Sequence, residues 1–329
     1  MYISGITDLV FYKNVVGKKI LLLGELHTQE TCQKPKEEVI QVSDLMLDVA
    51  YNIPDSQVLD IFMEGTYKKV EPEESNFNII ITQKILDRWV KQNNPNNVRL
   101  HFIDPRTIPF PNERYITSPL VEGIRIILNN EELVDRFVEN VTWIEVFDAI
   151  SFMMGDVGNH NTAMMSKVLQ NIQRILLERN IPTNISENLD DWMIGYFTVI
   201  SKELDKLDTS IISRQTLRRN LRECYLEYIQ EDAGDDDYMS CVVALSLLFA
   251  VPMDIYVLTR LFIRFAEKPG NRVNQREVKN VIIHSGTGHR RIYEKFFQKV
   301  FAVVPDLKLD SGGDETCLDI GEQEIDFWE

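Results

Sequence analysis

The sequence has no excess of basic residues, few cysteines and no long apolar run. Its 35 Lys and Arg residues stand against 51 Asp and Glu, so the formal net charge is −16. Nucleic-acid binding needs clustered cations that displace phosphate counterions, so this charge argues against a nucleic-acid partner. The apolar run Cys241–Met253 is shorter than the roughly 20 residues that a transmembrane helix requires. We therefore expect no membrane span.

The cysteines are too far apart for a metal-binding motif. They are Cys32, Cys224, Cys241 and Cys317, and no two of them have the close spacing of a zinc site. The first residues lack the basic-then-apolar layout of a secretory signal. We therefore expect reduced thiols and a cytoplasmic location.

Strand and helix patterns alternate in the first hundred residues. Short apolar runs at 19–23, 58–63 and 98–103 have the character of buried strands, and helical periodicity appears at about 35–49 and 79–90. This alternation predicts parallel strands joined by right-handed crossovers. The strand pattern returns at 278–284, followed by an amphipathic helix at 290–300 and a last strand at 301–304.

The expected fold class is α/β, with a mostly parallel central sheet flanked by helices and a large helical insertion between strands three and four. The insertion is predicted because almost only helical periodicity is found from Ser118 to Glu267. The expected organisation is a first part of the α/β core at 1–110, a helical insertion or cap at 111–267, a second part of the core at 268–308, and an acidic, disordered tail at 309–329.

Polar side chains follow the four predicted parallel strands. Because the carboxyl ends of parallel strands lie along one edge of a sheet, these groups should converge on one crevice. They are Glu25 and His27 after the first strand, Glu64 after the second, Asp104 and Arg106 after the third, and Ser285 and His289 after the fourth.

These residue types suit two kinds of chemistry. Imidazole and carboxylate groups bind divalent metals, and without a metal a His oriented by a Glu can activate water. The Gly-rich turn before His289 adds backbone N–H groups at a helix start, which favour an anion. Structural alternatives stay open: Asp104-Pro105-Arg106 is also typical of a turn with an internal ion pair, and His284 falls inside a strand.

Two GxxH motifs, Gly24-Glu25-Leu26-His27 and Gly286-Thr287-Gly288-His289, follow an early and a late strand. This arrangement, with Glu64 after the second strand, resembles the superfamily that joins the TIKI and TraB proteins, the ChaN-like haem-uptake lipoproteins and the erythromycin esterases. The resemblance covers roughly 18–106 and 250–305. Cytosolic relatives among large DNA viruses suggest a viral member, located in the host cytoplasm or the virion.

The resemblance implies a hydrolase, either a metal-dependent peptidase or an esterase-like enzyme, acting on a small-molecule or peptide substrate. His27, Glu64 and His289 would bind a divalent metal (manganese, cobalt, zinc or iron), and Glu25 would orient or activate water. Arg106 and Arg260 would stabilise an anionic group; Arg260 occupies the place of an Arg that family members carry on the helix before the second motif. The alternative is a non-enzymatic binding protein, which would use the crevice for a haem-type ligand, with Tyr256 as a cofactor-binding residue, or bind a protein partner through the acidic tail.

Overall fold

The computed structural model of the chain describes residues 1–26, 32–64, 84–85, 87–89, 95–103, 119–154, 161–180, 200–263, 278–312 and 316–321. The chain divides into two compact units. The first consists of Met1–Asp104 and Arg264–Glu329, and the second of Pro105–Ile263. We refer to them as the sheet unit and the helical unit.

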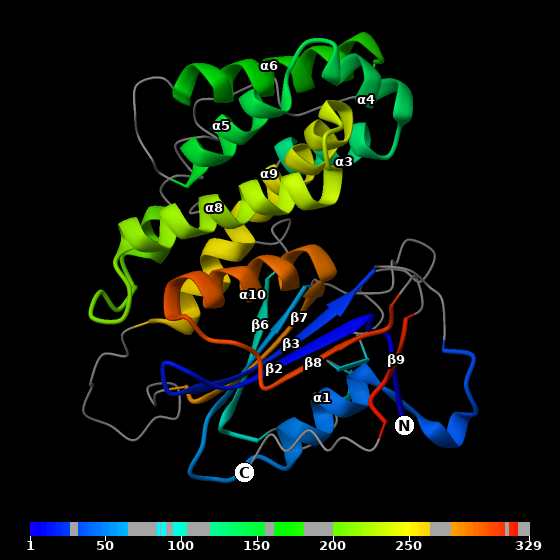
Figure 1. Cartoon of the computed structure of the whole chain (residues 1–329), viewed down its shortest axis with the longest axis vertical. Coiled ribbons are helices and arrows are strands. Elements are labelled where there is room, and N and C mark those ends of the chain that lie inside the picture. Colours follow the sequence, from blue (N-terminus) through cyan, green and yellow to red (C-terminus); the bar gives the residue numbers. More distant parts are fainter. Residues whose placement is uncertain are drawn as a thin grey trace. The chain divides into compact units, whose positions relative to one another are not determined.

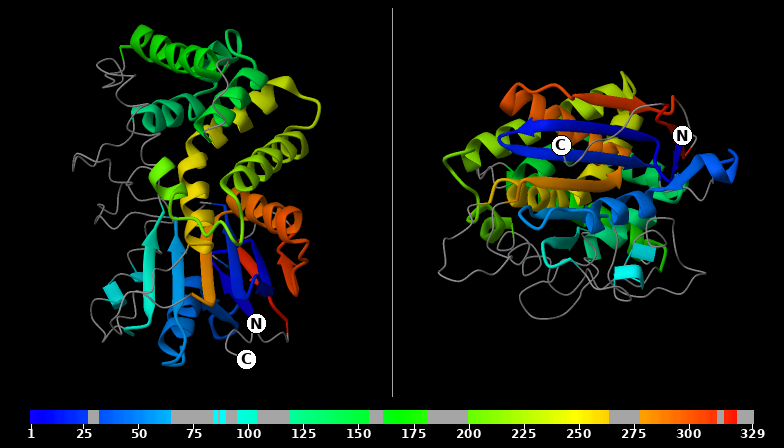
Figure 2. Two further views of the ribbon diagram at one scale, coloured as in Figure 1. Left: turned by 90° about the vertical axis from the view of Figure 1, so that its left-hand side faces the viewer. Right: turned by 90° about the horizontal axis from the view of Figure 1, so that it is seen from below.

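The core of the sheet unit is a six-stranded sheet in the order β6-β5-β7-β3-β2-β8 (Figure 1, Figure 2). Its strands are β2 (Asp8–Val15), β3 (Lys18–Glu25), β5 (Leu59–Met63), β6 (Val98–Phe102), β7 (Asn280–Gly286) and β8 (Leu307–Asp310). Strands β6, β5, β7 and β3 are parallel, whereas β2 is antiparallel to both β3 and β8. The four predicted strands form the parallel part. The sheet as a whole is mixed, so the prediction of a mostly parallel sheet is wrong.

The antiparallel part begins with a hairpin that the sequence analysis missed. Strand β2 turns into β3 through Val16 and Gly17, whose φ angles are 52° and 78°. The backbone N–H of Gly17 donates to the Asn14 side chain at 2.7 Å, which closes the turn. Positive φ at both central residues is the geometry whose twist matches two antiparallel strands. In the sequence, the signal for this hairpin was Gly17, which stands between two apolar runs.

Helices cover opposite faces of the sheet, α1 (Val42–Tyr51) on one and α10 (Thr287–Phe301) on the other (Figure 1). The core on the α1 face includes Leu21, Leu23, Ile61, Met63 and Ile282 of the sheet with Val42 and Met46 of the helix. On the α10 face the ring of Tyr12 meets Phe297 edge-on, with 5.6 Å between ring centroids. Side chains alternate between faces along a strand, so residues in register on neighbouring strands share a face.

A small sheet of order β4-β1-β9 also belongs to the sheet unit. Its strands are β1 (Tyr2–Ser4), β4 (Val39–Gln41) and β9 (Cys317–Asp319), and a short 3-10 helix, η1 (Lys36–Glu38), precedes β4. The helix expected from Pro35 therefore begins only at Val42, because residues 39–41 pair with β1 instead. The helix expected at about 79–90 falls mostly outside the described residues.

The C-terminal region differs from the expected disordered tail. The strand expected at 301–304 lies instead at Leu307–Asp310, after α10 ends at Phe301. Beyond it, Cys317–Asp319 forms β9, so the prediction of disorder from residue 309 is wrong for the described residues 309–312 and 316–321. Cys317 is joined to Cys32 by a disulfide, with 4.8 Å between the Cα atoms. The expectation of four reduced thiols therefore holds only for Cys224 and Cys241, which are buried and form no disulfide.

The described part of the helical unit is built from α3 (Pro119–Leu128), α4 (Glu131–Val138), α5 (Trp143–Met153), α6 (Asn161–Glu178), α8 (Arg214–Ala233) and α9 (Asp237–Leu261). Polar N-caps begin several of them: Thr142 forms a capping box with Glu145, and Asp236 accepts from the first turn of α9. All six helices lie between β6 and β7 in the chain.

Among the described residues, no single helix is both long and apolar enough to cross a membrane. The two arms of α9, Asp237–Leu248 and Ala250–Leu261, meet that test only as a pair bent by 53°.

Strands β5 and β6 are joined by a buried ion pair. The Arg99 guanidinium donates to Asp60 from Nε at 2.5 Å and from Nη2 at 2.9 Å. His101 lies 3.4 Å from the same carboxylate and stacks on Phe62. Burial by itself raises the pKa of Asp60, but hydrogen bonds from His101 and Arg99 outweigh it, so the pKa is lowered.

The Asp60→Asn variant should lose about 2–4 kcal/mol of unfolding free energy at neutral pH, because it leaves Arg99 without its buried counter-charge. A carboxyl whose pKa is lower in the folded state stabilises the fold above its unfolded pKa of about 3.9 and loses that contribution as pH falls. The difference between wild type and variant should therefore shrink below about pH 4. Urea unfolding across this range measures it; a difference that stays constant down to about pH 2 would contradict the assignment.

Candidate functional site

The carboxyl ends of β3, β7 and β5 lie side by side. Glu25 at the end of β3 is in register with Gly286 at the end of β7, and Met63 of β5 is in register with His284 of β7. The backbone N–H of Glu64 continues this pairing by donating to the His284 carbonyl at 2.9 Å. The chain segments carrying Glu25, Glu64 and the second GxxH motif therefore share one sheet edge, as the sequence predicts.

Glu64 connects the end of β5 to the start of α10. Its carboxylate accepts a hydrogen bond from the Gly286 N–H at 2.7 Å. Gly286 is the N-cap of α10 and has no side chain that could satisfy the first turn. A carboxylate at this position is favoured by the positive end of the helix dipole. One role of Glu64 is therefore to anchor the turn that leads to His289.

Glu25 points into the sheet unit and pairs with His284. Its Oε2 lies 3.4 Å from the Nε2 of His284, and both side chains are fully buried. His284 is in register with Leu23, whose side chain packs on the α1 face, so the pair lies on that face of the sheet. A buried carboxylate beside an imidazole fixes the orientation of the ring. His284, expected in the core of the strand, is thus the partner of a predicted catalytic residue.

His289 lies in the first turn of α10, three residues after the N-cap. Its side chain is half-buried, and its ring is inclined by 30° to that of Tyr293 with 6.4 Å between centroids. Because His289 stands in the first turn, the backbone N–H groups around it have no acceptor within the helix itself. The turn therefore combines an imidazole with donors suited to a developing negative charge.

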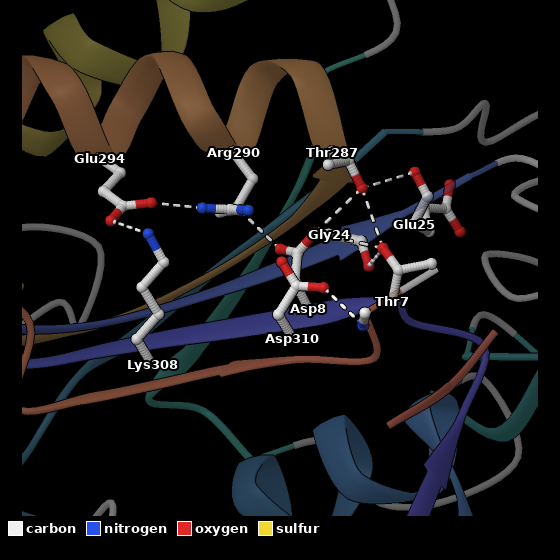
Figure 3. Close-up of polar contacts among 10 residues, drawn as sticks. Thr7, Asp8, Gly24, Glu25, Thr287, Arg290, Glu294, Lys308 and Asp310 are labelled. Carbon is white, nitrogen blue, oxygen red and sulfur yellow. Dashed lines mark hydrogen bonds and ion pairs between the residues drawn. The ribbon is translucent and has the colours of Figure 1, made fainter. Parts of the chain in front are cut away.

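A buried polar network, which the sequence analysis missed, holds this turn on the sheet (Figure 3). The Thr287 hydroxyl lies within hydrogen-bonding distance of three oxygens: Asp8 Oδ2 at 3.1 Å, Thr7 Oγ1 at 3.0 Å and the Glu25 carbonyl at 3.3 Å. Asp8 also pairs with Arg290, whose Nε lies 2.5 Å from Oδ1. The network therefore joins β2, the end of β3 and the first turn of α10.

The network continues to the surface and constrains β3. Arg290 also pairs with Glu294 one turn along α10, and Lys308 of β8 donates to Glu294 at 2.6 Å (Figure 3). On β3, Gly24 lies against the Asp8 carboxylate: an added Cβ would be 2.3 Å from Asp8 Oδ1. The first GxxH motif therefore needs glycine at its first position for lack of space. A buried Asp before an apolar run was the sequence signal for this network.

The remaining predicted residues lie in the helical unit or outside the described residues. Arg260 and Tyr256 belong to the helical unit, where the Arg260 guanidinium lies 5.1 Å from the centre of the Tyr256 ring. Arg260 Nε is also 3.6 Å from a carboxylate oxygen of Glu203. His27 and Arg106 lie outside the described residues, so their predicted roles stay predictions.

Two of the three predicted metal ligands, Glu64 and His289, are among the described residues. Over the ranges that the structure describes, no three or more His, Cys, Asp or Glu side chains are placed to hold one metal ion. His27, one of the three predicted ligands, is outside those ranges. The edge does provide oxygen and nitrogen donors of the right chemistry, from Glu64 and His289. The donor types fit a divalent metal, and the set stays a prediction.

Comparison with known proteins adds no relative: no protein-family model matches the chain, and neither a curated protein nor a solved structure matches it. The resemblance to the TIKI, ChaN-like and erythromycin-esterase superfamily therefore stays a prediction from the two GxxH motifs.

We expect the Gly24→Ala variant to lose about 2–4 kcal/mol of unfolding free energy, because the new methyl group must displace the buried Asp8 carboxylate from Arg290. The matched control is Asp8→Ala. In that background the space opposite Gly24 is open, so adding Gly24→Ala should cost less than about 1 kcal/mol. Urea unfolding of the two single variants and the double variant measures the cycle. Equal costs of Gly24→Ala in both backgrounds would contradict the proposed contact.

Proposed function

We propose that the sheet edge formed by the ends of β3, β5 and β7 is the active site of a hydrolase that activates water at its His and Glu side chains. The observation that carries the proposal is the hydrogen bond from Gly286 to Glu64. It fixes a carboxylate from one strand end to the helix start that carries His289, beside the strand end that carries Glu25. Convergence of ionisable groups at one sheet edge is typical of catalytic sites in α/β proteins.

The residues divide into two roles. Glu25 and His284 form a buried pair at 3.4 Å. The carboxylate would orient the imidazole ring, and the pair would share a proton during catalysis. Glu64 and His289 are attached to the α10 turn, whose N–H groups suit binding the oxyanion that forms when water attacks a carbonyl or phosphoryl centre. The Thr287 hydroxyl holds that turn against Asp8.

A divalent metal, where bound, would supply a Lewis acid and lower the pKa of a coordinated water. Glu64 and His289 would hold it together with His27. The roles of Arg106 and Arg260 in stabilising an anionic group stay predictions from the family resemblance. The substrate class within this proposal is a small molecule or a peptide. The alternative, a non-enzymatic binding protein for a haem-type ligand with Tyr256 as a cofactor-binding residue, stays a prediction.

The proposal is tested by assaying the protein, loaded with manganese, zinc, cobalt or iron, against chromogenic peptide, ester and phosphoester substrates. The His289→Ala variant should lose at least about 100-fold in kcat/KM, because the residue acts in the transition state. His101→Gln is the matched control, since His101 pairs with Asp60 on β5 and should leave kcat/KM within about threefold of wild type. Wild-type activity retained in folded His289→Ala would refute the assignment.

A further inference from the structure

The chain that follows the end of β3 is attached to the small sheet at three places. Cys32 is joined to Cys317 of β9 by the disulfide. Two residues later, the Lys34 ammonium lies 5.1 Å from the centre of the Tyr2 ring of β1. Val39–Gln41 then pairs with β1 as the parallel strand β4. We call residues 32–41 the docked segment.

The disulfide is the strongest of these attachments. The Lys34 side chain is exposed, and a cation–π contact at an exposed site is weak. Strand β4 pairs over three residues only and lies at the edge of its sheet. The covalent link closes a loop of 285 residues, and cross-links that close long loops restrict the open chain most. Without it, the docked segment keeps only short and partly exposed contacts.

The two pairs of cysteines differ in their access to solvent. Cys32 is half-buried, and Cys317 retains 8% of its surface. Cys224 and Cys241 are fully enclosed in α8 and α9, and burial raises the pKa of the Cys241 thiol to about 12. Thiol–disulfide exchange needs both access and a thiolate. The Cys32–Cys317 pair is therefore the one suited to exchange.

We propose that Cys32 and Cys317 form a reversible redox latch that keeps the docked segment on β1 and β9 when oxidised and releases it when reduced. In the closing reaction, the thiolate of one cysteine attacks a small-molecule disulfide such as glutathione disulfide and displaces one thiol. The second cysteine thiolate then displaces the other thiol and forms the Cys32–Cys317 bond. Two electrons and the two cysteine protons pass to the oxidant, which leaves as two thiols; a dithiol reverses the reaction.

The latch lies close in sequence to the proposed active site. Only residues 26–31 separate Glu25, at the end of β3, from Cys32. Opening the latch therefore removes the anchor of the chain that leaves the active-site edge. The redox latch is inferred from the disulfide and the small sheet and not from the proposed function. Failure of one proposal therefore leaves the other untouched.

The test uses the full-length protein after incubation with glutathione disulfide or with dithiothreitol. Alkylation under denaturing conditions followed by mass spectrometry should find two reactive thiols in the oxidised protein and four in the reduced one. Trypsin cleavage after the exposed Lys36 should accelerate about tenfold on reduction, because local opening limits cleavage. The Cys32→Ser variant should be cleaved at the fast rate under both conditions, and Cys241→Ser should respond to redox as wild type does.

The main comparison is between oxidised and reduced wild type, which have the same sequence. Its result therefore does not depend on whether a variant folds. Four reactive thiols after oxidant treatment would overturn the proposal, and so would equal cleavage after Lys36 in both states. Cleavage that accelerates equally after Arg219 in α8 would indicate global unfolding and would also overturn it.

Discussion

The start of α10 is held on the sheet by the buried carboxylate of Asp8, and the candidate site depends on this contact. Asp8 faces Arg290 and the Thr287 hydroxyl, and each of the two charged side chains is about 2% exposed. Breaking a buried ion pair by removing one partner leaves an uncompensated charge, which is far more costly than losing a surface pair. The helix turn that carries His289 therefore has little freedom to move away from the edge of β3.

This constraint gives the two GxxH motifs different physical meanings. In the first motif, Gly24 is required by the space that the Asp8 carboxylate occupies, and Glu25 turns inward to His284. In the second, Gly286 exposes a backbone N–H that donates to Glu64. Each motif thus brings a carboxylate to the same sheet edge, Glu25 directly and Glu64 through its hydrogen bond from Gly286.

Sequence patterns located the parallel strands because each is a continuous apolar run, and they placed Glu25 and Glu64 at one edge because parallel strands end together. They failed where the decisive contact lies far away in the chain. The partner of Asp8 and the link from Cys32 to Cys317 depend on the folded arrangement, and the link spans 285 residues. The β2–β3 hairpin is local, and its sequence signal, Gly17 between two apolar runs, was overlooked. Arg260 was placed by resemblance alone, and its contacts lie within the helical unit.

The central claim is that both GxxH motifs contribute residues to one water-activating site. The metal content of the purified protein tests this claim most directly. Elemental analysis would compare wild type, the His27→Ala/His289→Ala double variant and the His101→Gln control, each after reloading with manganese, zinc, cobalt or iron. The account predicts near-stoichiometric metal in wild type and control and its loss in the double variant, because each ligand removed weakens binding strongly. Near-stoichiometric metal retained by the double variant would contradict it, and no metal in reloaded wild type would contradict the metal ligands His27, Glu64 and His289.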